Sequence, residues 1–163
     1  RRALDRLGAT LSISEAFREV VPGLFVTGEI PRRTDFEDVG GPFFLDEQGN
    51  QPDPLLDDQA LFFESSEGCV VLLGCAHAGV VNTLMHVQQL TGGKRMQAVL
   101  GGLHLLHASD ERLARTITAL SRWRVQRLAP GHCTGPLAVA RLWAAFPEQC
   151  TALHTGSRFI LGR

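Results

Sequence analysis

The sequence predicts an α/β fold, because three apolar segments typical of strands each lead through a glycine-containing turn into a segment typical of a helix. With 163 residues, 44% of them hydrophobic and 20% charged, the chain is long enough to bury a sizeable core. Its net charge of −1 argues against a nucleic-acid partner or a polybasic membrane contact. No apolar run approaches the ~18 residues that a membrane span needs, so no membrane partner is expected.

The N-terminal third contains little regular pattern. Residues 1–8 are typical of the last turns of a helix that ends at a glycine, and residues 9–30 of a short strand, a loop and the apolar segment 22–26. Residues 31–58 are rich in Pro, Gly, Asp and Glu and show little periodicity. At that length they predict a functional loop or lid rather than a linker.

The pattern becomes regular from residue 60 onward. Residues 60–64 and 69–73 predict two strands joined as a hairpin by the turn at 65–68. The three strand–turn–helix units that follow have helices at about 80–90, 110–123 and 136–146, and Pro136 favours the start of the last one. A final pair of strands is predicted at about 151–154 and 158–161.

Three histidines occupy equivalent places in these units. His77, His104 and His132 each follow a strand and precede a helix, at separations of 27 and 28 residues. Because ligands of α/β sheets bind at the carboxyl ends of strands, the three imidazoles are expected to converge at one edge. Imidazole suits zinc and iron, and a bound divalent ion can activate water or polarise a phosphate or carbonyl oxygen. The pattern predicts a metal or catalytic site; the alternative is that each histidine caps a helix or hydrogen-bonds within its loop.

The other histidines and the cysteines carry weaker signals. His86, His107 and His154 are expected to be structural or at the surface. The four cysteines form no C-x-x-C pair, which predicts reduced thiols and a cytoplasmic location, with Cys69 buried in its apolar run. Cys75 and Cys133 flank two of the strand-end histidines, so a closed structural site of two cysteines and two histidines is an alternative, although no zinc-ribbon spacing is present.

Five motifs, in this order along nearly the whole chain, resemble the metallo-β-lactamase superfamily. Within it they are most similar to the dihydropterin-methyl-ribofuranosylaminobenzene 5′-phosphate synthase-like branch. The motifs are TGEIPR at 27–32, DDQAL at 57–61, GCAHAGVVNT at 74–83, GGLHL at 101–105 and GHCTG at 131–135.

This resemblance implies a four-layer αββα sandwich with a di-metal site between its two sheets. His77 matches a histidine that completes one metal site, and His132 matches the last histidine, which serves the second metal. His104 stands where an aspartate usually bridges the metals, so it is expected to be a ligand, an acid/base group or a substrate contact. The H-x-H-x-D-H motif of the superfamily is absent from this sequence. Residues 1–163 are therefore expected to form the C-terminal portion of the domain.

The implied partners follow from that portion. They are a small-molecule substrate, the N-terminal half of the domain, a further copy of the chain as a homo-oligomer, and a divalent metal, with zinc first and iron or manganese as alternatives. Arg32, with Arg33, is expected to bind a substrate phosphate, and Asn82 to bind substrate near a helix N-terminus. Asp58 is expected to orient a metal-binding histidine. The alternatives are solvated loop arginines, a helix cap and an Asx turn.

The expected function is that of a metal-dependent enzyme acting on a phosphorylated or ester-like small molecule. Hydrolysis is the default reaction of the superfamily, and a pterin-linked synthase or transferase reaction is implied by the nearest branch. His77 and His132 would bind the metal, and His104 would bind it or transfer protons. The alternatives are a non-catalytic module that binds a ligand or partner, and a truncated product that is inactive alone.

Overall fold

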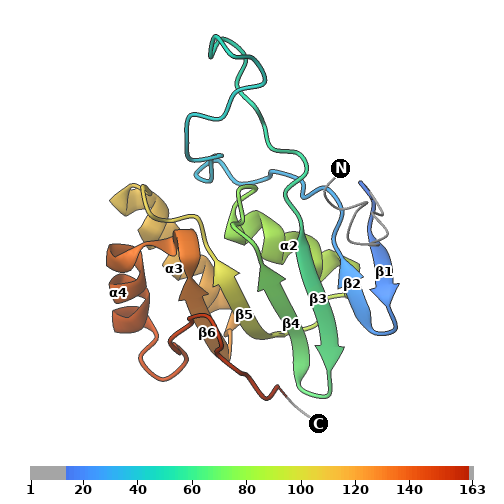
Figure 1. Cartoon of the computed structure of the whole chain (residues 1–163). Coiled ribbons are helices and arrows are strands. Elements are labelled where there is room, and N and C mark those ends of the chain that lie inside the picture. The colour runs from blue at the N-terminus through green and yellow to red at the C-terminus, as the bar shows by residue number, and fades with distance from the viewer. Residues whose placement is uncertain (1–13, 162–163) are drawn as a thin grey trace.

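The computed structural model describes residues 14–161, and its centre is one mixed six-stranded sheet (Figure 1). The helix end expected at residues 1–8 lies outside the described residues. The strands lie side by side in chain order; the first four are antiparallel, and the last two run parallel to the fourth. Their bounds are β1 Arg18–Val21, β2 Leu24–Val26, β3 Ala60–Ser65, β4 Gly68–Leu73, β5 Met96–Gly102 and β6 Arg127–Gly131.

The helices follow the last three strands as predicted. They are α2 Val80–Leu90, α3 Asp110–Trp123 and α4 Pro136–Ala145, with a short 3-10 turn, η1 His132–Thr134, after β6. The start of α3 shows the local cause: the Ser109 Oγ accepts a hydrogen bond from the Arg112 backbone N–H at 3.1 Å, and two acidic residues occupy the first turn. The predicted hairpin is confirmed by the β3–β4 ladder.

One face of the sheet packs against the helices and forms the main core. Val71, Val99 and Leu128 of the three last strands contact a layer that includes Leu84 of α2 and Leu142 of α4, all at most 1% exposed. Their neighbours in sequence, such as Val70 and Ala129, point to the opposite face and are also fully buried. These strands are therefore continuous apolar runs because both faces are covered.

The C-terminal segment covers the second face. Leu153, Phe159 and Leu161 pack against the cluster formed by Val70, Ala98, Leu100 and Ala129. The predicted strands at 151–154 and 158–161 are wrong, because the one backbone bridge to the sheet there joins Cys150 to Leu128. The segment instead lies across the sheet and buries its alternate apolar side chains against the sheet face. A paired strand would show the same alternation in sequence.

The 31–58 segment is irregular, as predicted, apart from one bridge between Phe44 and Pro52. It extends beyond the edge of the sheet at which β4, β5 and β6 end (Figure 1). The α/β class is confirmed, as one sheet with three helices on one face. The described residues contribute one sheet of the expected sandwich. None of their helices is both long and apolar enough to cross a membrane.

Candidate functional site

The turns at the ends of β4, β5 and β6 share an unusual backbone geometry. Ala76, His104 and His132 have positive φ angles of 57°, 51° and 50°. Residues other than glycine rarely adopt this region, and such residues cluster at functional sites. Their glycine neighbours provide the close approach: the backbone N–H of Gly102 donates to the Gly74 carbonyl at 3.1 Å. The sequence therefore places three strained turns at one sheet edge.

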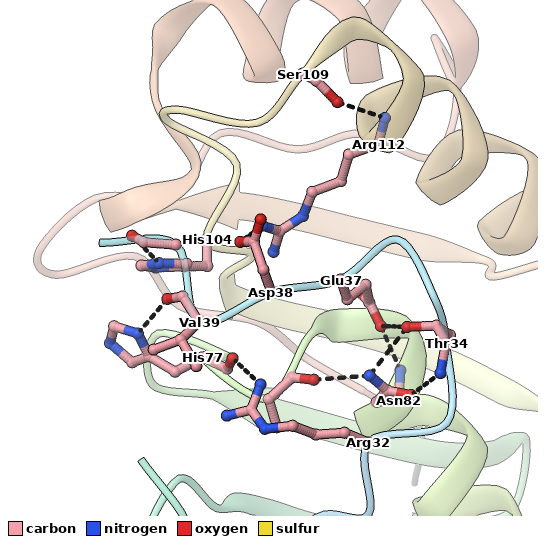
Figure 2. A network of polar contacts seen from close by, with 12 residues as sticks. Arg32, Thr34, Glu37, Asp38, Val39, His77, Asn82, His104, Ser109 and Arg112 are labelled. Atoms are coloured by element: carbon pink, nitrogen blue, oxygen red, sulfur yellow. Dashed lines mark hydrogen bonds and ion pairs between the residues drawn. The ribbon is translucent and has the colours of Figure 1, made fainter. Parts of the chain in front are cut away.

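His77 and His104 form a pair at this edge. Their ring centroids lie 4.1 Å apart, and Figure 2 shows both rings next to the loop that carries Val39. Each ring has one nitrogen facing a loop carbonyl: His77 Nδ1 lies 3.3 Å from the Val39 oxygen, and His104 Nε2 lies 2.9 Å from the Gly40 oxygen. A carbonyl accepts only an N–H, so these contacts favour the tautomers that leave His77 Nε2 and His104 Nδ1 with a lone pair.

The surroundings of His104 lower the pKa of its imidazole and so favour the neutral form. Burial lowers its pKa, the hydrogen bond to Gly40 opposes that shift, and the nearby His77 and Arg112 lower it further. Its Nδ1 is buried and has no hydrogen-bond partner among residues 14–161. A neutral imidazole with a free lone pair can bind a metal or accept a proton. The pair therefore fits the carbonyl-supported histidines that bind metals.

His132 lies in a different cluster. Its Nε2 is 3.2 Å from the Cys75 Sγ, and the donor atoms of Cys75, His132 and Cys133 all lie within 4.8 Å of one another. Among the described residues, this is the one group of three candidate ligands whose donor atoms lie that close together. The donor atoms of His77, His104 and His132 do not form such a group. The closed site of two cysteines and two histidines is not formed, because His77 points to Val39 instead.

The trio is built by three strand ends. Thr134, fully buried, accepts a hydrogen bond from the Leu103 N–H at 3.0 Å and donates one to the Gly131 carbonyl at 2.7 Å, which fixes η1 against β5. A Cβ at Gly102 would lie 2.7 Å from the Cys133 Sγ, so the absent side chain leaves room for this sulfur. Burial, with smaller contributions that include Cys75, raises the pKa of Cys133 to about 11.

The N-terminus of α2 is occupied by a carboxylate that the sequence analysis missed. Glu37 Oε1 and Oε2 accept hydrogen bonds from the backbone N–H groups of Val81 and Asn82, each at 2.8 Å. Figure 2 shows Glu37 beside Asn82. Burial raises the pKa of Glu37, and these two hydrogen bonds oppose the shift. The predicted anion position is thus filled by a side chain from the 31–58 segment.

Asn82 holds the same segment in place. Its side chain is fully buried, and Oδ1 accepts hydrogen bonds from the backbone N–H groups of Arg33 and Thr34 at 2.8 and 3.0 Å. Its Nδ2 donates to the Ala78 carbonyl at 2.8 Å. The structure therefore places Asn82 beneath the loop as a positioning residue, with its side-chain oxygen and nitrogen both used.

Arg32 and Asp58 contact the turn that carries His77. The Arg32 guanidinium donates to the carbonyls of His77 and Pro54 at 2.8 and 2.7 Å. Asp58 Oδ2 accepts from the Ala78 N–H at 2.7 Å. Both side chains thus bind backbone groups around His77. Asp58 does not contact a histidine ring, which it was predicted to orient. Arg33 is exposed.

A cavity of about 550 Å³ adjoins His104. Its lining includes Phe43, His104, Cys133 and Arg112. The Arg112 side chain is 6% exposed and forms an ion pair with Asp38 at 2.5 Å, while its Nε and Nη2 are buried without a hydrogen-bond partner among the described residues. The cavity has the size of a small-molecule site and a cation in its wall.

The remaining histidines behave as expected. His86 is half-buried, with Nε2 3.3 Å from the Thr27 carbonyl, and His107 and His154 are exposed. Cys75 and Cys133 were identified from the sequence, as ligands of an alternative site, because both sit in strand-end turns. Glu37 and Arg112 were missed, because their partners are 44 and 74 residues away.

The chain is similar in sequence to two curated proteins. The chain is 31% identical over 157 residues to the 7,8-dihydropterin-6-methyl-4-(β-D-ribofuranosyl)-aminobenzene-5′-phosphate synthase of Methanocaldococcus jannaschii, covering 94% of this chain and 53% of that protein. An uncharacterised protein of the same archaeon is 28% identical over 138 residues, covering 82% and 49%. The chain thus spans about half the length of the curated relatives it matches.

A solved structure supports the likeness. The crystal structure of a metal-dependent hydrolase of the β-lactamase superfamily superimposes with a TM-score of 0.82 at 28% identity, over 94% of this chain and 59% of that one. No protein-family model matches the chain. The predicted resemblance of this chain to the metallo-β-lactamase superfamily, and to the dihydropterin-methyl-ribofuranosylaminobenzene 5′-phosphate synthase-like proteins, is thereby confirmed.

Proposed function

We propose that the chain forms part of a metal-dependent enzyme that acts on a phosphorylated or ester-like small molecule. The observation that carries the proposal is the pair of His77 and His104, each fixed by a loop carbonyl so that one ring nitrogen keeps a lone pair. The buried, unpartnered Nδ1 of His104 is a donor atom that fits a metal or a proton. The names of a synthase relative and a hydrolase neighbour support an enzyme of this class.

Each residue has a proposed part. His77 and His132 would each ligate a divalent metal, in separate positions at the sheet edge, with zinc first and iron or manganese as alternatives. When bound, the metal supplies a Lewis acid to a phosphate or carbonyl oxygen. His104, beside the cavity and paired with His77, binds the metal of His77 or accepts a proton at Nδ1. Arg112 in the cavity wall is ion-paired with Asp38, and its Nε and Nη2, which have no partner among the described residues, offer N–H donors to an oxygen of a substrate.

The reaction is proposed as hydrolysis or as a pterin-related synthase or transferase reaction. The loop contributes to either by covering the two histidines: Val39 and Gly40 set their tautomers, and Phe43 packs edge-on against His77 with centroids 5.1 Å apart. We also propose a cytoplasmic location, which the four unpaired thiols support. The N-terminal half of the domain or a further copy is proposed as the cover of exposed apolar side chains such as Leu45 and Leu56, at 65% and 54% exposure.

The test uses the whole chain loaded with Zn²⁺ or Mn²⁺ and p-nitrophenyl phosphate esters as probes. The double variant His77→Ala, His132→Ala is expected to lose both bound metal and turnover. His86→Ala, which changes a histidine outside the lining of the cavity and outside the group of Cys75, His132 and Cys133, serves as the matched control for removing an imidazole. A double variant that retains metal and turnover would overturn the proposal.

A non-catalytic module that binds a ligand or partner is the second candidate. It is favoured by the way the chain fills its own anion positions, with Glu37 at the start of α2 and Asp38 on Arg112. This candidate predicts that the chain binds metal or the phosphate probe without turnover. Measurable turnover that disappears in the double variant would exclude it.

A further inference from the structure

We infer that Cys75, His132 and Cys133 form a thiolate metal site of their own, with two sulfur ligands, one nitrogen ligand and an open fourth position. The inference deepens the proposed function, on which it rests for His132 as a metal ligand. It goes beyond the resemblance, which implies histidine ligands, by assigning the two cysteines. It also separates His132 from the pair of His77 and His104.

The distances fit a tetrahedral ion. Zinc bound at about 2.3 Å from sulfur and about 2.0 Å from nitrogen holds its ligand atoms roughly 3.5 Å apart. The Cys75 Sγ and His132 Nε2 are 3.2 Å apart, and the three donor atoms lie within 4.8 Å of one another. Small side-chain rotations therefore suffice to place all three around one ion.

The backbone fixes the donors before any ion binds. The Gly102 N–H donates to the Gly74 carbonyl, joining the turn of Cys75 to the end of β5. The Cys133 carbonyl accepts from the Leu106 N–H at 3.1 Å, and Thr134 ties η1 to β5. The ends of β4 and β6 thus present the ligands, and the end of β5 holds both turns in place, which lowers the entropy cost of binding.

The chemistry of the donors selects the ion. Two thiolates and one imidazole are soft ligands that favour zinc over magnesium or calcium. When a divalent ion binds, the Cys75 and Cys133 thiols release their protons to water, and the two negative charges balance the ion. Three protein ligands with a vacant position are the pattern of catalytic rather than structural zinc sites. His132 is exposed, so that position is open to water or to an oxygen or nitrogen atom of a substrate.

The test is cobalt substitution of the reduced 163-residue chain, with a phosphine reductant that keeps the thiols free. We expect Co²⁺ to bind with a thiolate-to-cobalt charge-transfer band in the near ultraviolet, and Zn²⁺ to displace it. Cys75→Ala and Cys133→Ala should abolish the band. Cys150→Ala removes a thiol that lies outside the trio, and His77→Ala changes the other histidine cluster; both should keep the band.

Each outcome decides. Cobalt bound without the band, a band that survives both cysteine variants, or no cobalt bound to the reduced chain would overturn the thiolate site. The first of these results would leave the proposed metal-dependent function standing on His77 and His104. Loss of turnover in the His77, His132 double variant tests that function separately. Because a cysteine variant can misfold, zinc X-ray absorption of the unmodified chain provides a second measurement: two sulfur neighbours support the site, and a shell without sulfur refutes it.

Discussion

Replacing Glu37 with alanine should destabilise the fold through the start of α2. The carboxylate accepts the N–H groups of Val81 and Asn82 at 2.8 Å, and these residues are 5% and 0% exposed. Each buried N–H left without an acceptor costs about 1–3 kcal/mol. In the unmodified chain, burial of the carboxylate costs desolvation free energy, as the raised pKa of Glu37 indicates. The substitution removes this cost, and that offsets part of the loss. We therefore expect the free energy of unfolding to fall by about 2–4 kcal/mol.

Urea denaturation followed by circular dichroism measures this loss, with the midpoint and slope fitted together. Glu47→Ala is the matched control, because Glu47 belongs to the same 31–58 segment but is exposed. Its midpoint should equal that of the unmodified chain. A Glu37→Ala midpoint that also stays unchanged would show that water satisfies the two N–H groups, and the reasoning would be refuted.

Further predictions concern the same region and the core. Gly79→Ala places a Cβ against the Glu37 carboxylate at a φ of 99°, so it should destabilise the fold, and the loss should shrink in the Glu37→Ala background when both are measured as a double-mutant cycle. The pKa of Glu37 is raised, so its stabilising contribution is present below the ordinary value of 4.5 and is lost as the pH rises through the folded-state pKa. The destabilisation of Glu37→Ala should therefore be largest in mild acid, and a deficit that grows with pH instead would contradict the sign. Leu84→Ala, at a fully buried position of α2, should cost about 2–5 kcal/mol, whereas Leu137→Ala, at 72% exposure, should change stability by less than about 0.5 kcal/mol; equal thermal shifts would contradict the assigned core.

Local signals in the sequence were enough to locate the helices and most strands. The bounds of α2 and α3 are those predicted, because glycine turns and the Ser109 cap mark where each helix begins. The strand pair predicted at 151–161 failed because apolar alternation does not distinguish a paired strand from a segment lying across a sheet face. The alternation of apolar residues predicts which side chains are buried. It does not predict which backbone groups are hydrogen-bonded to each other.

The site was predictable as a location but not as a set of contacts. The three strand-end histidines do lie at one edge of the sheet, but Ala76 adopts a left-handed conformation between Cys75 and His77. As a result, the Cys75 side chain contacts His132 and the His77 side chain contacts Val39. These opposite directions depend on how neighbouring turns pack, between residues that are 57 and 38 positions apart. Spacing along the chain carries no information about them.

The four consecutive residues 37–40 each hold a different part of the molecule: Glu37 the start of α2, Asp38 an arginine of α3, and Val39 and Gly40 the two histidines. In the stretch that follows, residues 41–51, Phe43 packs against the His77 ring, but none of its described residues forms a hydrogen bond or ion pair with a helix. The segment is therefore divided into an anchor and a tip. Insertions or exchanges in the tip can reshape what reaches the cavity while the anchor keeps the imidazole tautomers unchanged. Under the proposed function, substrate range and proton chemistry would then change independently of each other.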